Sequence, residues 1–123
     1  MYSLKALLTI TTTAFLVTAA PASDATASYS GDMTFYNPEG VTGKCGHNNL
    51  QTDHVVALSA SQLNGVANCD KTIRIHRNDL STTAKVVDLC PGCGSGSVDV
   101  TPAVFNVLAD PAEGRVHVTW EFI

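Results

Sequence analysis

The sequence predicts an all-β fold, a compact barrel of about six short strands with one or two small helices. Short apolar or alternating segments recur along the chain, and Gly, Pro and Asn residues that favour turns separate them. Of the 123 residues, 45% are hydrophobic and 15% are charged, which is typical of a globular domain. About a hundred residues follow the N-terminal segment described next, which is enough for one hydrophobic core and too few for two.

The N-terminal segment has the features of a secretory signal peptide. Lys5 precedes an apolar run over residues 6–20, and small residues surround two cleavage motifs. Threonines interrupt the run, which is shorter than the ~20 apolar residues of a membrane-spanning helix. We therefore expect residues 1–22 to be a signal peptide, with cleavage as late as Ala27. The protein is then secreted and extracellular, and its domain covers residues 28–123.

The formal net charge is −4, and it becomes −5 once Lys5 is removed. No cluster of basic residues interrupts this acidic balance. Nucleic acids and anionic membranes bind through such clusters. We therefore expect no nucleic acid and no membrane among the partners, and we expect a monomer.

Six segments have the patterns of strands, over residues 33–36, 55–58, 72–76, 83–87, 98–100 and 116–122. The first stops at a turn-forming Asn-Pro pair, and the second is a continuous apolar run that predicts a buried strand. The third alternates and leads through the hairpin turn Asn78-Asp79 into the fourth. The fifth is short. The sixth also alternates, which assigns the face with Val116, Val118, Trp120 and Phe122 to the core.

Two short helices and one long loop complete the pattern. Ser59 and Gln62 have the spacing of a capping box, so a helix should begin there and end near Gly65. Thr101 is suited to be the N-cap of a second helix, because Pro102 follows it, and this helix should run over residues 103–109. Residues 41–53 are expected to form a loop.

The sequence contains four cysteines, Cys45, Cys69, Cys90 and Cys93. An even number in a secreted protein predicts two disulfides, and three connectivities are open. The spacing of Cys90 and Cys93 also suits a redox pair, but such a pair opens a helix, and a Gly/Ser loop follows here. A zinc site built from these cysteines and His47 lacks a second close ligand pair. We expect structural disulfides, no metal and no cofactor.

Two aspartates are the first candidates for a functional site. Asp99 lies between Val98 and Val100, so its side chain points outward if the valines face the core. Asp88 ends the fourth strand, where the loop closed by Cys90 and Cys93 begins. Such a pair can carry out general acid/base catalysis or bind sugar hydroxyls. The alternative is that both carboxylates only accept hydrogen bonds from loop amides.

Several segments, taken together, resemble the small secreted RlpA-like proteins, which are double-psi β-barrels of the expansin, loosenin and barwin-like superfamily. These segments are Gly31-Asp32-Met33-Thr34-Phe35-Tyr36, Lys44-Cys45-Gly46, Val55-Val56-Ala57-Leu58, Val87-Asp88-Leu89-Cys90-Pro91-Gly92-Cys93, Val98-Asp99-Val100-Thr101-Pro102-Ala103-Val104-Phe105 and Val118-Thr119-Trp120. The resemblance covers essentially the whole domain, and its most specific part is the Asp-x-Cys-Pro-x-Cys block with the aspartate that follows it. It implies a six-stranded double-psi β-barrel.

The resemblance also implies a function. Expansins and single-domain loosenins bind and loosen cellulose or chitin without evident hydrolysis. Their sugar-binding residues match Thr34, Asp88 and Asp99, and Tyr36 is a stacking candidate because it shares a face with Thr34. Cys90 replaces an aromatic residue that is common in the family. The expected partner is therefore a cell-wall polysaccharide: cellulose, chitin or peptidoglycan.

Two enzymatic relatives match less well, so catalytic residues are not expected beyond Asp99 and Asp88. Inverting endoglucanases of this superfamily need a carboxylate base just after the first-strand tyrosine, where this chain has Asn37-Pro38. Lytic transglycosylases pair an aspartate with a histidine just after the second strand. The chain has Ser59 there, and His54 stands at the other end of that strand.

A third relative is an inhibitor of papain-type cysteine proteases on the same barrel. Its mode of action needs an exposed, ordered loop, and residues 41–53 and 90–97 are the candidates. An extracellular protease is thus the alternative partner. For the disulfides, the Pro-Gly turn favours a Cys90–Cys93 bridge, which leaves Cys45 to pair with Cys69.

Overall fold

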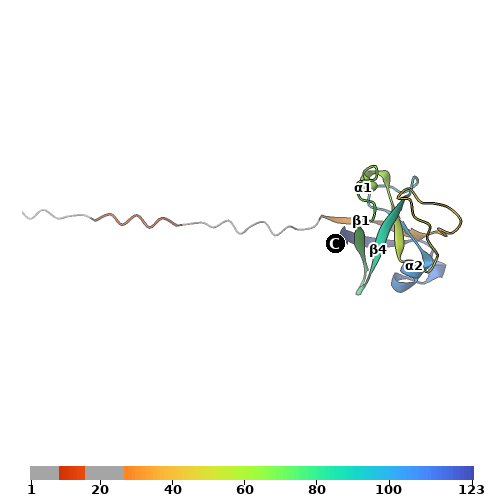
Figure 1. Ribbon diagram of the computed structural model, residues 1–123. Helices are drawn as coiled ribbons and strands as arrows, with labels where there is room; N and C mark the ends of the chain where they lie inside the picture. The colour runs from red at the N-terminus through yellow and green to blue at the C-terminus, as the bar shows by residue number, and fades with distance from the viewer. Residues whose placement is uncertain (1–8, 16–26) are drawn as a thin grey trace, which may run out of the picture.

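The computed structural model describes residues 9–15 and 27–123. Apart from residues 9–15, which have no regular secondary structure, the predicted signal peptide lies outside the described residues. The remaining chain folds as a closed barrel of six strands (Figure 1). The strands are β1 (Ser28–Phe35), β2 (Val55–Leu58), β3 (Thr72–Arg77), β4 (Leu80–Leu89), β5 (Val98–Val100) and β6 (Val116–Phe122). The predicted barrel is confirmed.

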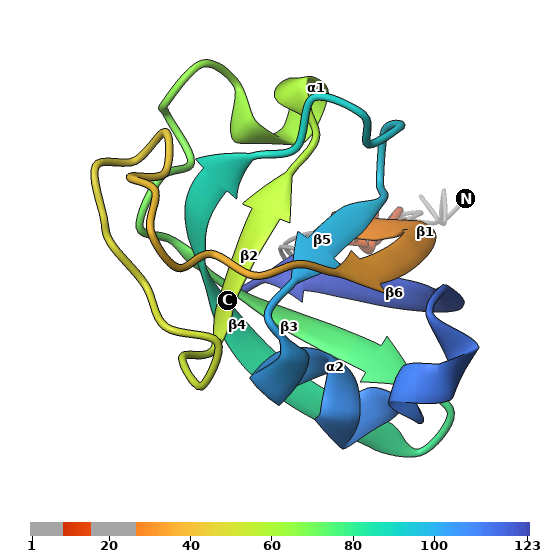
Figure 2. The same ribbon diagram turned by 90° about the vertical axis from the view of Figure 1, so that its right-hand side faces the viewer.

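The strands follow one another around the barrel in the order β1-β5-β2-β4-β3-β6, and β6 pairs back with β1. Two pairs are parallel, β1 with β5 and β2 with β4, and the others are antiparallel. Consequently β5 lies between β1 and β2, although β2 follows β1 in the sequence (Figure 2). The segment that follows β1 crosses in front of β5 and β2 in the same view.

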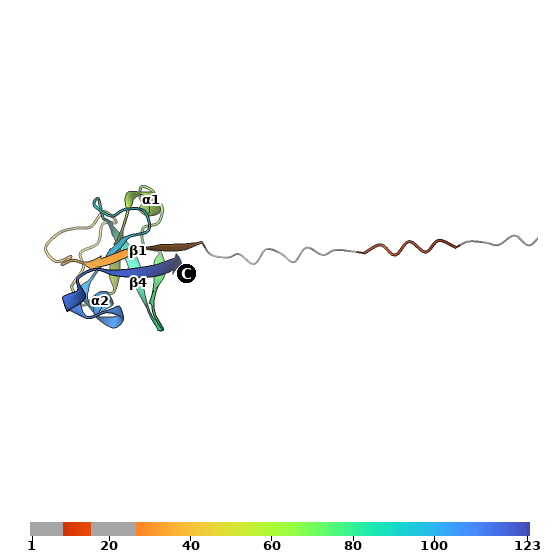
Figure 3. The same ribbon diagram turned by 180° about the vertical axis from the view of Figure 1, so that it is seen from behind.

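Two short helices lie at opposite ends of the barrel, α1 (Ala60–Leu63) and α2 (Pro102–Leu108), as Figure 3 shows. Ser59 caps α1 by accepting a hydrogen bond from the Gln62 backbone N–H, as the capping box predicted. Pro102 occupies the start of α2, but the Thr101 side chain makes no capping hydrogen bond. Thr101 is the N-cap residue, as predicted, and its hydroxyl donates to the Asp53 carbonyl instead of to the helix. A 3₁₀ turn, η1 (Pro111–Glu113), leads into β6.

Two strands are longer than their patterns suggested. β1 begins at Ser28 rather than at residue 33, and β4 covers Leu80–Leu89 rather than residues 83–87. The added residues are mostly polar or small and none of them is buried, so they lack the apolar pattern that marks a strand. Pairing with a neighbouring strand defines them: Ser28 lies opposite Glu121 of β6, and Leu80 lies opposite Arg77 across the predicted hairpin turn.

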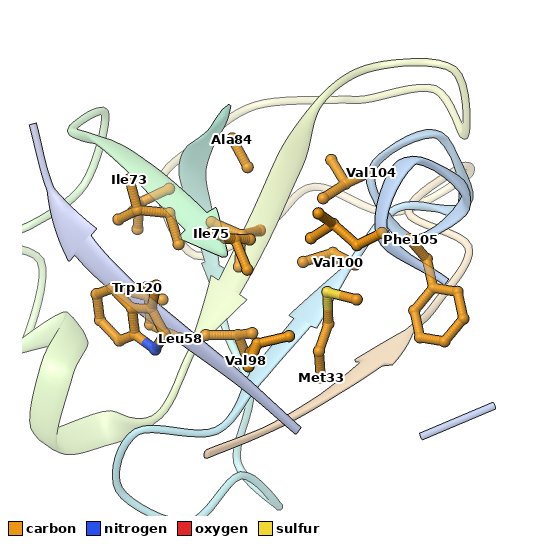
Figure 4. Packing of buried hydrophobic residues seen from close by; sticks show 14 of the residues in the cluster. Met33, Leu58, Ile73, Ile75, Ala84, Val98, Val100, Val104, Phe105 and Trp120 are labelled. Atoms are coloured by element: carbon orange, nitrogen blue, oxygen red, sulfur yellow. The ribbon is translucent and has the colours of Figure 1, made fainter. Parts of the chain in front are cut away.

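The core fills the barrel with side chains from all six strands and is closed by α2 (Figure 4). Its largest members are Trp120, Phe105, Met33, Leu58, Leu63, Ile73, Ile75 and Leu108. Val116 and Val118 are buried beside Trp120, while Phe122 at the end of β6 is only partly buried. Trp120 is therefore a core residue, as the alternation predicted. Its indole N–H donates to the Gly96 carbonyl at 2.8 Å, which satisfies the one polar group of the ring.

The loop that carries Gly96 makes close backbone contact with β1. A Cβ at Gly96 would overlap the Ser30 carbonyl oxygen, and the positive φ of 85° at this residue also favours glycine. The buried Gln62 amide holds the same loop by donating to the Ser95 hydroxyl and accepting from the Gly96 N–H. This packing fixes the segment between the Cys90–Cys93 bridge and β5.

Two disulfides join Cys45 to Cys69 and Cys90 to Cys93, which are the pairs predicted from the sequence. The first bridge fastens the loop after β1 to the segment before β3. The second closes the turn directly after β4. Because all four cysteines are bridged, none of them is a thiolate ligand for zinc. No helix among the described residues has the length and apolar character needed to cross a membrane.

Candidate functional site

Asp99 and Thr34 form the centre of the candidate site. They lie opposite each other on the parallel strands β1 and β5, and the Thr34 hydroxyl donates to Asp99 Oδ1 at 3.0 Å. Val98 and Val100 are fully buried, so Asp99 points outward, as predicted. Burial raises the pKa of the Asp99 carboxyl, while the Thr34 hydrogen bond and the Arg115 charge act in the opposite direction. The carboxyl thus lies at a boundary between the barrel wall and solvent.

Asp88 lies two strands away in the same row. Ala57 of β2 is the register partner of Asp99 on one side and of Asp88 on the other. Two strand spacings separate the aspartates, or about 10 Å between Cα atoms. Thr34, Asp99, Ala57 and Asp88 therefore form one row across β1, β5, β2 and β4. The small Ala57 side chain separates the two carboxylates.

A β-bulge gives Asp88 its place in this row. Val86 of β4 lies opposite Val56, but the next pair joins Ala57 to Asp88, so Val87 is the extra residue. Strict alternation from the buried Ala84 and Val86 would have turned Asp88 toward the core. Asp88 is not the strand-end residue that the sequence predicts, because β4 continues to Leu89 and the bulge reverses the alternation.

The backbone holds one oxygen of Asp88. Oδ1 accepts hydrogen bonds from the N–H groups of Lys44, at 2.7 Å, and Leu89, at 2.8 Å. Lys44 precedes Cys45, whose bridge to Cys69 fixes this loop against β4. Asp88 Oδ1 therefore accepts hydrogen bonds from backbone amides, as the alternative interpretation of the sequence predicted. Oδ2 takes part in neither bond.

Tyr36 follows β1 and extends its pairing, because its N–H donates to the Val100 carbonyl at 2.9 Å. Its hydroxyl oxygen is buried and has no hydrogen-bond partner within the described part of the chain. Burial raises the pKa of Tyr36 to about 12, and the charges of Asp88 and Asp99 add to the shift. The hydroxyl therefore lies near both carboxylates and keeps its proton throughout the physiological range.

A cavity of about 210 Å³ adjoins the Thr34 end of the row. The disulfide of Cys90 and Cys93 forms one wall, and Asp32 and Arg115 belong to the lining as well. Arg115 Nη1 contacts Asp32 Oδ2 at 3.3 Å. Nothing in the local sequence pattern marks either residue as part of a site. Their proximity depends on the pairing of β1 with β6, which alternation alone does not reveal.

The remaining sequence candidates lie outside this row. His54 is three residues before Ala57, about 10 Å along the strand, and its ring contacts the Thr83 carbonyl. At the endoglucanase base position, Asn37 accepts a hydrogen bond from the Glu39 N–H through its side chain. His47 pairs with Asp70. Within residues 9–15 and 27–123, no group of three or more His, Cys, Asp or Glu side chains is arranged to hold a metal ion.

Known proteins resemble the chain in both sequence and structure. An EG45-like domain containing protein from Citrus jambhiri is 30% identical over 110 residues, which cover 78% of this chain and 82% of that protein. An allergen from Aspergillus fumigatus is 34% identical, and the match covers 75% of this chain and 36% of that protein. The ripening-related protein grip22 from Vitis vinifera is 39% identical over 56% of this chain and 38% of its own length. The chain thus spans well under half the length of these last two relatives. No family model matches the chain.

Solved structures share the barrel. The apo form of a Clavibacter michiganensis expansin superposes with a TM-score of 0.72 and 24% identity, over 79% of this chain and 50% of the expansin. A Streptomyces papain inhibitor superposes with a TM-score of 0.70 and 28% identity, over 79% of this chain and 94% of the inhibitor. The chain therefore belongs to the family of EG45-like proteins, and it shares the double-psi β-barrel fold of the expansin.

Proposed function

We propose that the protein is secreted and that it binds and loosens cell-wall polysaccharide without hydrolysing it. The observation that carries this proposal is the outward row of Thr34, Asp99 and Asp88 across four adjacent strands. Such a row presents hydrogen-bonding groups along a line, which suits an extended sugar chain. Cellulose, chitin and peptidoglycan are the substrates to test.

Each group in the row has a defined role in binding. Asp99 and Asp88 accept hydrogen bonds from sugar hydroxyls, and Thr34 adds a hydroxyl beside them. The half-buried ring of Tyr36 provides a surface on which a sugar can stack. Each contact contributes about 1 kcal/mol net, so affinity should be modest and should grow with the number of sugars bound. The cavity beside Thr34 offers room for the chain to continue.

The same geometry argues against hydrolysis. The raised pKa of Asp99 suits a general acid, but an inverting mechanism also needs a second carboxylate that activates water. Asp88 Oδ1 is occupied by two backbone N–H groups, and Asn37-Pro38 supplies no carboxylate at the endoglucanase base position. Loss of such a base typically reduces the rate about 10²–10⁴-fold.

Two kinds of similarity support this function. The chain is similar to an EG45-like protein and to ripening-related proteins of plants. It also shares its fold with an expansin that has been solved in complex with cellohexaose, at a TM-score of 0.71 and 22% identity. That likeness concerns the fold, so the ligand assignment for this chain depends on the row of Thr34, Asp99 and Asp88 described above.

Pull-down on cellulose, chitin and peptidoglycan tests the proposal. The unmodified protein should be retained on at least one polymer, and Asp88→Ala and Asp99→Ala should each reduce that retention. Asp79→Ala is the matched control, because Asp79 is an exposed aspartate in the hairpin turn outside the row. Unchanged retention of both site variants would disprove the site assignment. Reducing-sugar release that Asp99→Asn abolishes would show that the protein is a hydrolase.

A second function, inhibition of a papain-type protease, is favoured by one observation. The match to the Streptomyces papain inhibitor extends over 94% of that protein, against 50% of the expansin. In this chain, the bridge between Cys45 and Cys69 holds the loop over residues 41–53, on which Val41 and Leu50 are exposed. Papain assays with the purified protein decide between the two. Inhibition that Leu50→Asp removes, together with no retention on any polymer, would favour the inhibitor.

A further inference from the structure

A second and larger hollow, of about 500 Å³, lies over the outer side of β3 and β6, away from Asp88 and Asp99. Two arginines and two histidines contribute to its lining: Arg77, Arg115, His76 and His117. The whole sequence has only three arginines and four histidines. Nitrogen-bearing side chains that can donate hydrogen bonds are thus gathered here. His76 is bonded to both carboxylate oxygens of Glu121, at 2.8 and 2.9 Å, which leaves the arginines and His117 to face a ligand.

The acidic residue of this hollow is already compensated. Arg77 contacts both oxygens of Glu113, through Nη2 at 3.0 Å and Nη1 at 3.4 Å. Glu113 also accepts a hydrogen bond from the Asp110 N–H, which closes the capping box of η1. Both oxygens of the Glu113 carboxylate are therefore bonded to groups of the protein itself. Of the remaining lining, Arg115 and His117 are exposed, and the Arg115 side chain is 66% accessible.

Arg115 connects the hollow to the candidate site. It lines both this hollow and the smaller cavity that contains Thr34. β1 and β6, which carry Thr34 and His117, lie side by side in the barrel (Figure 3). A ligand that passes over the Thr34 end of the row can therefore reach the larger hollow across Arg115. The pair of Arg115 with Asp32 lies at this crossing point.

We propose that this hollow binds the carboxylate groups of an acidic polysaccharide, one built from uronic acids. This rests on the proposed polysaccharide-binding function, and it names the class of sugar chain that the extended surface favours. The planar guanidinium of Arg115 presents several N–H donors in a geometry that matches a carboxylate. His117 lies two residues further along the chain and supplies a second donor. A neutral sugar chain offers these donors only hydroxyl and ring oxygens, which form weaker hydrogen bonds with a guanidinium than a carboxylate does.

The test compares a hexamer of galacturonic acid with the same hexamer after full methyl esterification, which has the same backbone without the charges. Isothermal titration calorimetry should show tighter binding of the acid form, and high salt should reduce the difference. Arg115→Gln should weaken binding of the acid form by about tenfold, as expected for loss of a charge-assisted hydrogen bond. His117→Gln should weaken it to a smaller extent. Arg74→Gln is the matched control, because Arg74 is an exposed arginine of β3 outside the lining.

Equal affinity for the acid and the ester would overturn the inference, and so would equal effects of Arg115→Gln and Arg74→Gln. Polyglutamate binding as tight as that of the hexamer would identify a general anion surface and would also overturn it. Asp99→Ala separates this inference from the proposed function. It should reduce retention on neutral polysaccharide, while the ratio of affinities for acid and ester stays the same. Loss of that ratio with normal neutral binding would refute only the inference.

Discussion

Replacing Tyr36 with phenylalanine removes one oxygen atom and leaves the ring. In the folded protein this oxygen is buried without a hydrogen-bond partner among the described residues, near the charges of Asp88 and Asp99. In the unfolded chain the same hydroxyl is hydrated. Folding therefore removes water from a polar group and provides no partner in return, so we expect Tyr36→Phe to stabilise the protein.

The magnitude follows from the degree of burial. A buried polar group without a partner costs about 1–3 kcal/mol, and the lower end applies because Tyr36 as a whole is only half-buried. A gain of about 1 kcal/mol corresponds to a rise in Tm of about 4–8 °C for a domain of this size. Urea unfolding at pH 7 measures the free energy directly. Tyr29→Phe is the control, because it removes a tyrosine hydroxyl from β1, just before Tyr36, that is not among the buried groups without a hydrogen-bond partner.

The pH dependence provides an independent check. The folded state retains the Tyr36 proton up to about pH 12, whereas the unfolded state loses it near the ordinary value of 10. The unmodified protein should therefore lose stability between these two values, because the folded state then binds more protons than the unfolded state. The phenylalanine variant lacks this loss, so its advantage should grow above pH 10. Lower stability of Tyr36→Phe at pH 7 would refute the reasoning and show that the hydroxyl has a partner.

Three further perturbations test the barrel. Loop-closure entropy predicts that loss of the Cys45–Cys69 bridge costs about 3.5 kcal/mol and loss of Cys90–Cys93 about 1.9 kcal/mol, because their sequence separations are 24 and 3. Urea unfolding of the paired alanine variants should reproduce that order. Asp99→Asn should match the unmodified protein near pH 3 and exceed its stability by pH 7. Burial raises the pKa of Asp99 in the folded state above the ordinary value of 3.8, so the unfolded state releases this proton first and the unmodified protein loses stability as the pH rises. Gly96→Ala should destabilise by ~3 kcal/mol or more, with Gly92→Ala near neutral because its Cβ would meet open space.

The sequence patterns located the strands where side chains alternate or are uniformly apolar, and they missed strand residues that lack both features. The core of β3 and β6 followed from alternation, because each buries every second residue. Residues 28–32 of β1 are mostly polar or small, so only their pairing with β6 makes them a strand. Local amino-acid composition does not reveal which distant segments pair through backbone hydrogen bonds, so it could not predict these strand residues.

The site was predicted in its residues but not in its construction. Alternation placed Asp99 outward correctly, because the valines on both sides are buried. For Asp88 the same rule would have failed, since the bulge at Val87 reverses the alternation. The position of Ala57 between the two carboxylates depends on a parallel and an antiparallel pairing of one strand. Register of this kind is a property of the closed barrel rather than of any segment.

The contacts that stabilise the loop after β1 also limit the chemistry of Asp88. Hydrogen bonds to charged groups contribute about 1.5–3 kcal/mol each, so the two backbone N–H groups on Oδ1 hold the carboxylate in one orientation. A base that must take a proton from water during catalysis is poorly served by such partners. An acceptor for sugar hydroxyls needs an oxygen that is held in place and is not already bonded, and Asp88 Oδ2, which takes part in neither backbone hydrogen bond, meets that requirement.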